Sequence, residues 1–64
     1  MIGSFLLQYR AENGLTQTDL AKKLRISQNA ISQYESGKRT PTVKRLAQIA
    51  TTLGYTVSEI MADT

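Results

Sequence analysis

Three glycines divide this chain into stretches that favour short helices. Gly14, Gly37 and Gly54 each follow a segment in which apolar residues recur at helical spacing. Because glycine readily adopts the left-handed conformation that ends a helix, each of them predicts a helix stop. Thr16 and Ser27 stand at helix starts, where a hydroxyl side chain can cap free backbone N–H groups. We therefore expect an all-α fold.

The pattern predicts a compact bundle of five helices in a single domain over residues 1–64. Four helices are expected at about 3–12, 17–24, 28–35 and 43–53, and a short fifth carries Val57, Ile60 and Met61. The fifth begins at Thr56 and Glu59, whose spacing predicts a capping box. The expected apolar stripes hold Ile2, Leu6 and Tyr9 in the first helix and Val43, Leu46, Ile49, Ala50 and Leu53 in the fourth.

The composition excludes most catalytic and metal chemistry. The chain has no Cys and no His, which removes disulfides, thiol catalysis, the commonest general base and the commonest metal ligand. Its five Asp and Glu residues lack the neighbours of an acid–base pair, so we expect no enzyme, metal or cofactor. A chain of 64 residues has no room for an ordinary effector pocket, and no small-molecule ligand is evident. The uncharged run 1–9 is too short to span a membrane and lacks the flanks of a signal peptide, so a cytoplasmic location is expected.

The segment 28–35 carries an unusual helical face. With successive residues about 100° apart, Gln28, Asn29, Ser32, Gln33 and Ser36 fall within one arc of about 140°. This arc holds only uncharged hydrogen-bonding side chains. Amides can donate and accept at once, which suits a bidentate contact to adenine N6 and N7 in the major groove of DNA. The segment is either a DNA-reading helix or an ordinary polar surface helix, and the net charge of +3 permits a polyanionic partner.

The wider pattern resembles a helix-turn-helix domain of the phage repressor and Cro type (lambda-repressor-like). The stretches LTQTDLA, YESGKRTP and LAQIATTLG carry the resemblance, which covers essentially the whole chain, with the motif itself at about 17–36. Ala21 stands where that family keeps a small residue so that two helices cross closely, and Ile26, Ile31 and Tyr34 fall at its core positions. The family usually has Gly where this chain has Arg25, and Arg in a left-handed turn costs on the order of 1 kcal/mol.

The resemblance implies roles for individual residues. The positions that match base-reading positions of the recognition helix are Gln28, Asn29, Ser32 and Gln33. Gln17 matches a position that meets the DNA backbone and can brace the first recognition residue. The other residues expected at the DNA backbone are Ser36, Lys38, Arg39, Thr42 and Lys44. Arg10 and Glu35 match a partly buried ion pair that links the first helix to the end of the third.

These roles predict a sequence-specific regulator of transcription that binds double-stranded DNA. A single module of this size buries too little surface for high specificity, so a homodimer on a palindromic operator is expected, most simply as a repressor. The dimer surface is expected among Tyr55, Val57, Ile60 and Met61, with Phe5 and Leu7 as an alternative contact patch. Two alternatives stay open: a protein-interaction module of the antitoxin or adaptor type, and a DNA-binding fragment of a longer regulator.

Overall fold

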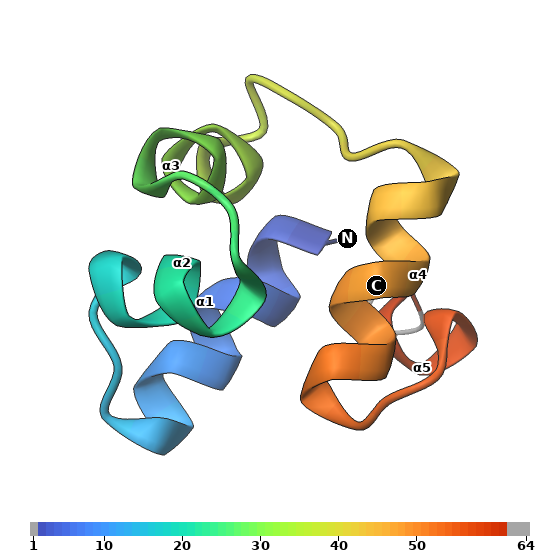
Figure 1. Ribbon diagram of the computed structural model, residues 1–64, viewed down its shortest axis with the longest axis horizontal. Coiled ribbons are helices and arrows are strands. Elements are labelled where there is room, and N and C mark those ends of the chain that lie inside the picture. Colours follow the sequence, from blue (N-terminus) through green and yellow to red (C-terminus); the bar gives the residue numbers. More distant parts are fainter. Residues whose placement is uncertain (1, 62–64) are drawn as a thin grey trace.

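The computed structural model describes residues 2–61, which fold into five helices. They are α1 (Ile2–Asn13), α2 (Gln17–Leu24), α3 (Gln28–Ser36), α4 (Val43–Leu53) and α5 (Val57–Met61) (Figure 1). The expected all-α fold is confirmed, although α1 is one residue longer at each end and α3 one residue longer at its end than the sequence predicted. The ends of the expected domain, residues 1 and 62–64, lie outside the described residues.

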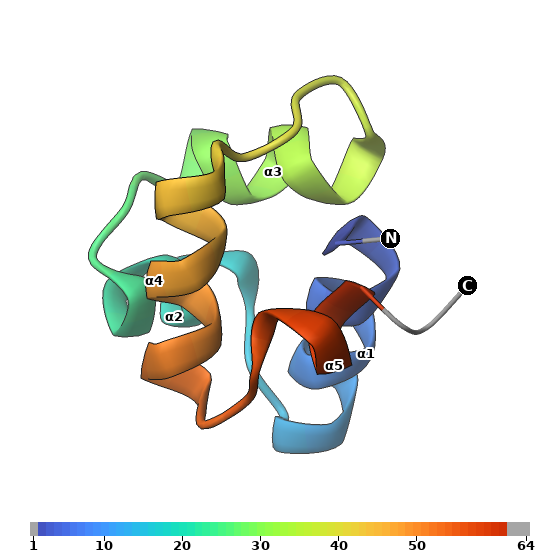
Figure 2. The same ribbon diagram turned by 90° about the vertical axis from the view of Figure 1, so that its right-hand side faces the viewer.

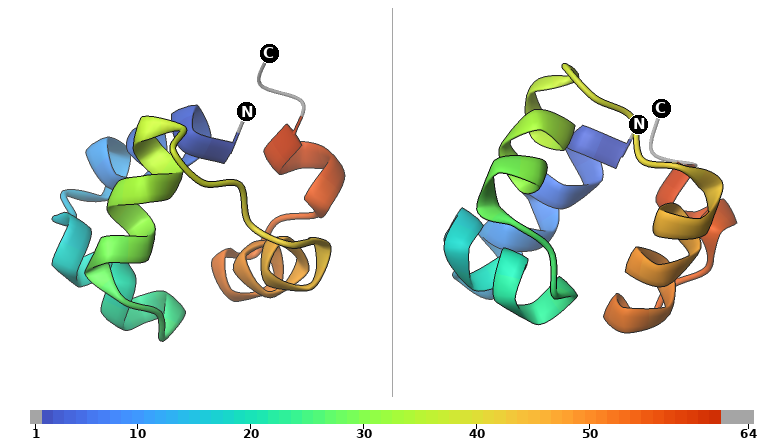
Figure 3. Two further views of the ribbon diagram at one scale, coloured as in Figure 1. Left: turned by 90° about the horizontal axis from the view of Figure 1, so that it is seen from above. Right: turned by 45° about the horizontal axis from the view of Figure 1, so that its top comes forward.

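The helices form two groups that face each other. The first group is α1, α2 and α3, and the second is α4 and α5 (Figures 1 and 2). Contacts of α2 with α4 and of α1 with α5 join the groups, and the α3–α4 loop crosses between them (Figure 3). Within residues 2–61, none of the helices combines the length and the apolar character needed to cross a membrane.

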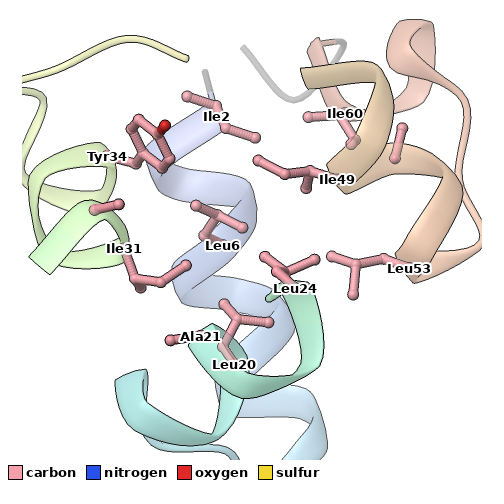
Figure 4. Packing of buried hydrophobic residues seen from close by; sticks show 12 residues of the cluster. Ile2, Leu6, Leu20, Ala21, Leu24, Ile31, Tyr34, Ile49, Leu53 and Ile60 are labelled. Atoms are coloured by element: carbon pink, nitrogen blue, oxygen red, sulfur yellow. The ribbon is translucent and has the colours of Figure 1, made fainter. Parts of the chain in front are cut away.

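Apolar side chains from both groups fill the space between them. Figure 4 shows Leu6 and Leu24 on one side and Ile49 and Leu53 on the other, with their side chains directed toward the shared core. The buried set consists of Ile2, Leu6, Leu20, Ala21, Leu24, Ala30, Ile31, Tyr34, Ile49, Ala50, Leu53 and Ile60. Burial of these apolar side chains is the main favourable term in folding. Because α3 contributes Ala30, Ile31 and Tyr34 to the core, the other face of α3, which carries its polar residues, is turned toward solvent.

One residue of the predicted apolar stripe of α4 lies outside this core. Val43 is 83% exposed, whereas Ile49, Ala50 and Leu53 are buried. Val43 precedes Ile49 by six residues, which is about 9 Å along a helix axis. The spacing correctly placed Val43 in this helix, of which it is the first residue, but periodicity does not show how far the neighbouring helices extend along it.

Within residues 2–61, a residue with a hydroxyl side chain caps the N-terminus of four helices, α2 to α5. Thr16 and Asp19 form a capping box at α2, with both hydrogen bonds at 3.0 Å, and Thr56 forms the same motif with Glu59 at α5. Ser27 Oγ accepts from the backbone N–H of Ala30, and Thr42 caps α4 in the same way. Such caps satisfy N–H groups that have no partner inside the helix.

A left-handed residue follows α1, α2 and α4, and at α2 and α4 it stands in the same motif. At α2, Arg25 N–H donates to Lys22 O at 3.3 Å, and Ile26 N–H donates to Ala21 O at 3.1 Å. This pair of hydrogen bonds is the Schellman motif, which needs a positive φ at its centre. Gly14 and Gly54 supply it elsewhere, but in α2 it is Arg25 that adopts a φ of 59°. The turn therefore has the geometry the resemblance implied, with a residue that is strained in it.

Gly3 allows α1 and α3 to pack closely. A Cβ atom at this position would lie 2.7 Å from the carbonyl oxygen of Tyr34 and 3.0 Å from that of Glu35. Both neighbours are backbone atoms of α3, so they cannot rotate away. Only glycine fits here without a shift of one helix relative to the other.

We expect Gly3→Ala to destabilise the protein by about 1–3 kcal/mol, because the added methyl group forces α1 away from α3. The steric cost opposes the gain in helix propensity, which is about 1 kcal/mol in a helix interior. Urea unfolding followed by circular dichroism measures the difference. Ser4→Ala, at an exposed position of the same turn, is the control and should change stability little. A Gly3→Ala variant as stable as the parent would contradict the close approach.

We expect Arg25→Gly to stabilise the protein by roughly 0.5–1 kcal/mol, because glycine adopts a positive φ without the Cβ clash. In a domain of this size, each kcal/mol corresponds to a rise of about 4–8 °C in Tm. Arg25→Ala is the matched control, since it removes the charge and keeps the Cβ atom. Equal gains in both variants would show that the side chain, and not the backbone conformation, sets the effect.

Candidate nucleic-acid interface

The solvent-facing side of α3 begins with two exposed amides. Gln28 and Asn29 occupy the first turn, directly after the cap at Ser27. Ala30, Ile31 and Tyr34 are buried on the opposite side of the helix. The core therefore holds α3 in one orientation and leaves its uncharged polar residues available for contacts.

The beginnings of α2 and α3 together line a shallow polar hollow. Its lining residues are Gln17 from α2 and Gln28, Asn29 and Ser32 from α3. Three of the four predicted base-reading residues thus lie beside the predicted bracing residue. Gln33, the fourth, does not line this hollow, and its side-chain Oε1 accepts a hydrogen bond from Arg39 Nη1 at 3.3 Å.

A series of hydrogen bonds connects the hollow to α1. Arg10 donates to Glu35 from Nε at 2.7 Å and from Nη2 at 3.0 Å. Glu35 Oε1 also accepts from Gln17 Nε2 at 2.9 Å. Gln17 Oε1 in turn accepts from Gln28 Nε2 at 3.4 Å. The structure thus forms the ion pair expected from the sequence, and Gln17 links it to the first residue of α3.

The ion pair lies at the edge of the core. The Arg10 and Glu35 side chains are 21% and 5% exposed. Burial by itself raises the pKa of the Glu35 carboxyl. The hydrogen bonds from Arg10 and Gln17, together with the charge of Arg10, outweigh burial, so the pKa lies below its ordinary value. The hydrogen bond to Glu35 raises the pKa of Arg10 in spite of the opposing effect of burial. At neutral pH, Glu35 is therefore ionised and acts only as an acceptor.

A basic loop follows α3 and continues into the start of α4. Lys38, Arg39 and Lys44 are exposed. The loop lies beside α3, along the upper side of the molecule in Figure 1. Ser36 Oγ donates to Gln33 O at 3.2 Å, and Thr42 Oγ1 accepts from Arg45 N–H at 3.1 Å. Ser36 and Thr42 thus have local structural roles, and their contacts with phosphate remain predictions.

The residues predicted for a dimer surface separate into two groups. Tyr55, Val57 and Met61 are exposed, at 38%, 36% and 44%. Ile60 is fully buried and belongs to the core, because it is on the side of α5 that faces the other helices. Ile60 is therefore the member of this set that closes the core, and it is not available for association.

The alternative contact patch is also divided. Leu7 is 46% exposed, but Phe5 is half-buried and packs against the core. The Phe5 ring meets that of Tyr55 edge-on, with centroids 5.0 Å apart, and lies 6.2 Å from that of Tyr9. Phe5 therefore closes the contact between α1 and the α4–α5 turn, which explains its place off the apolar stripe.

Sequence reasoning missed two features near this interface. The close approach at Gly3 fixes α1 against the end of α3, and the only signal for it was a glycine inside a predicted helix. The contact between Gln33 and Arg39 links a predicted base-reading residue to the basic loop. Its partners are six residues apart across a helix end, where no periodic pattern applies.

The fold, the connected pair α2–α3 and the polar face of α3 define a helix-turn-helix protein. The helix-turn-helix family matches residues 6–60, a span that contains both the hollow and the basic loop. The chain belongs to this family, in its Cro/C1-type form, whose members are DNA-binding regulators of transcription and not enzymes.

Individual relatives agree with this assignment. The chain is 36% identical over 64 residues to the uncharacterized HTH-type transcriptional regulator y4dJ of Sinorhizobium fredii, covering 100% of this chain and 83% of the relative. It is 44% identical over 55 residues to the uncharacterized HTH-type transcriptional regulator MJ0272 of Methanocaldococcus jannaschii, covering 86% and 83%. The solved clp gene regulator ClgR from Corynebacterium glutamicum superimposes with a TM-score of 0.79 at 30% identity, over 95% of this chain and 65% of that one.

We expect the ion pair to make stability depend on pH in the acid range. Because the pKa of Glu35 is lower in the folded than in the unfolded protein, the unfolded state binds more protons as the pH falls. The contribution is present above the ordinary value of 4.5 and is lost as the pH falls through the folded pKa. In thermal melts between about pH 7 and pH 2, Tm should fall less with decreasing pH for Glu35→Gln than for the parent. Parallel curves would contradict this assignment.

Proposed function

We propose that this protein is a sequence-specific regulator that reads the major groove of double-stranded DNA with α3. The observation that carries the proposal is the first turn of α3, where exposed amides border a polar hollow instead of the charged side chains usual on a surface helix. An α-helix fits the width of the major groove, and in helix-turn-helix proteins the N-terminal residues of the second helix meet the base edges.

The proposed base contacts follow from side-chain chemistry. Gln28 and Asn29 each offer a donor and an acceptor, which match adenine N7 and N6. Ser32 adds a short hydroxyl that can donate or accept, and Gln33 stands at the edge nearest the basic loop. These four residues are the proposed source of sequence preference.

The proposed backbone contacts lie on both sides of α3. Gln17 opens α2, where free backbone N–H groups and the helix dipole favour a phosphate. The loop and the start of α4 supply the remaining contacts: Ser36, Lys38, Arg39, Thr42 and Lys44. Such contacts position a protein on DNA and make its affinity depend on salt.

The proposed assembly is a homodimer on a palindromic operator. Tyr55, Val57 and Met61 provide an exposed apolar surface at the C-terminal end of the described chain. Two modules related by a two-fold axis would read half-sites about one helical turn of DNA apart. The simplest regulatory outcome is repression, since a bound dimer covers part of a promoter.

A protein-interaction role is the second candidate. Leu7 is 46% exposed on α1, a larger exposure than its neighbour Leu6, which is fully buried. An adaptor or antitoxin would use such apolar side chains to bind another protein. The DNA-binding experiment below separates the two candidates.

We expect Gln28→Ala to weaken binding to the best site by roughly 1–3 kcal/mol and to relax preference at one base pair. We expect Lys38→Ala, as the matched backbone variant, to weaken all duplexes about equally and to lower the salt slope by about one unit. The best site comes from selection out of random duplex DNA at two salt concentrations, and titrations then compare it with random DNA.

The outcomes of the selection decide the proposal. A two-fold symmetric consensus supports a dimeric reader and gives the half-site spacing directly. A single half-site supports sequence reading and overturns the dimer. No enrichment at either salt overturns DNA reading and favours the protein-interaction candidate. Equal losses of specific and random binding in Gln28→Ala overturn the base-reading role of that residue.

A further inference from the structure

The side-chain amide of Gln28 has one of its two N–H groups engaged. Nε2 donates to Gln17 Oε1 at 3.4 Å. This leaves Oε1 and the second N–H of Gln28 free at the hollow. The amide therefore offers one acceptor and one donor, and not two donors.

Glu35, the next residue along the series, determines that Gln28 donates to Gln17 and does not accept from it. Gln17 Nε2 donates to Glu35 Oε1 at 2.9 Å, which leaves Gln17 Oε1 on the side of Gln28. An ionised carboxylate accepts hydrogen bonds and cannot donate them. Reversal of the Gln17 amide would bring its Oε1 against the oxygens of Glu35, which is repulsive. Each amide in the series is thus oriented by the charge at its end.

We propose that Glu35 is a positioning residue for base selection, acting through Gln17 to fix which atoms of the Gln28 amide face the DNA. This inference rests on the proposed function, in which Gln28 reads a base. It assigns to the ion pair a role in specificity in addition to its role in joining α1 to α3.

The fixed orientation favours adenine over guanine at the base pair read by Gln28. Adenine presents the N6 amino donor beside the N7 acceptor, which match the free Oε1 and N–H of the amide. Guanine presents two acceptors, O6 and N7, and its O6 would face Oε1 without a hydrogen. In the reversed orientation, Gln28 Oε1 would accept from Gln17, and both N–H groups would be free for guanine.

Arg10 has a different part in this arrangement. It donates two hydrogen bonds to Glu35 and a third to the carbonyl oxygen of Leu15 at 3.2 Å. These contacts anchor the carboxylate and help to keep it ionised. The direction of the series depends on the carboxylate itself, so a conservative change at Arg10 should affect stability more than base preference.

The test compares three variants on two duplexes. One duplex is the best site of the parent, and the other has the A·T pair read by Gln28 replaced by G·C, that pair being the one at which Gln28→Ala loses its preference. A bidentate contact discriminates by about 5- to 150-fold. Glu35→Gln, which can donate as well as accept, should reduce the ratio of affinities to about threefold or less. Gln17→Met should reduce it similarly while leaving the ion pair intact.

Arg10→Lys is the control for a purely structural effect. It keeps the positive charge beside Glu35 but loses the two-pronged contact, so Tm should fall while the adenine-to-guanine ratio stays within about twofold of the parent. An unchanged ratio in Glu35→Gln and Gln17→Met overturns the inference. A ratio that falls equally in Arg10→Lys also overturns it. If Glu35→Gln fails to fold, as judged by circular dichroism, the result for Gln17→Met decides. Failure of the parent to select any site contradicts the proposed function instead.

Discussion

The packing of α1 against the C-terminal half of α3 is the contact on which the rest of the structure depends. At one end, Gly3 brings the two backbones so close that a Cβ atom would lie 2.7 Å from Tyr34 O. Further along α1, Arg10 holds the carboxylate of Glu35. Tyr34 and Glu35 are adjacent, so the Gly3 contact and the Arg10 contact both hold the same turn of α3. With that turn fixed, the orientation of the polar face of α3 follows.

The ion pair also joins the interior of the domain to its candidate interface. A partly buried ion pair contributes little net stability when compared with apolar residues of similar shape, because both charges lose hydration. Here the Glu35 carboxylate has a second use, since it orients Gln17, which contacts Gln28. Burying the charge of Glu35 costs free energy, but the buried carboxylate also fixes the arrangement of the Gln17 and Gln28 amides at the surface.

Helix boundaries were predictable from the sequence because local chemistry decides them. Thr16 with Asp19, and Thr56 with Glu59, cap helices within their own four residues, and Gly14, Gly37 and Gly54 have the positive φ expected of helix stops. The exposure of Val43 and the burial of Ile60 depend on where other helices lie in the folded protein. The spacing of apolar residues within one helix does not show this. The resemblance to repressors placed Arg10 beside Glu35, but the hydrogen bond between Gln33 and Arg39 depends on the path of the loop and was not predicted.

The polar hollow has a consequence for how this domain can diverge. Within residues 2–61, Asn29 and Ser32 take no part in the side-chain hydrogen bonds that join the helices, whereas Gln17 and Gln28 do. Mutations at Asn29 and Ser32 therefore leave these hydrogen bonds intact, and under the proposed function each of them would alter the preferred operator. Gln17 and Gln28 share a hydrogen bond, so a change at one of them removes a partner of the other. Under the proposed function, descendants of this chain should reach new operators first through Asn29 and Ser32, because changes at Gln17 or Gln28 also disturb the hydrogen bonds that lead to Glu35.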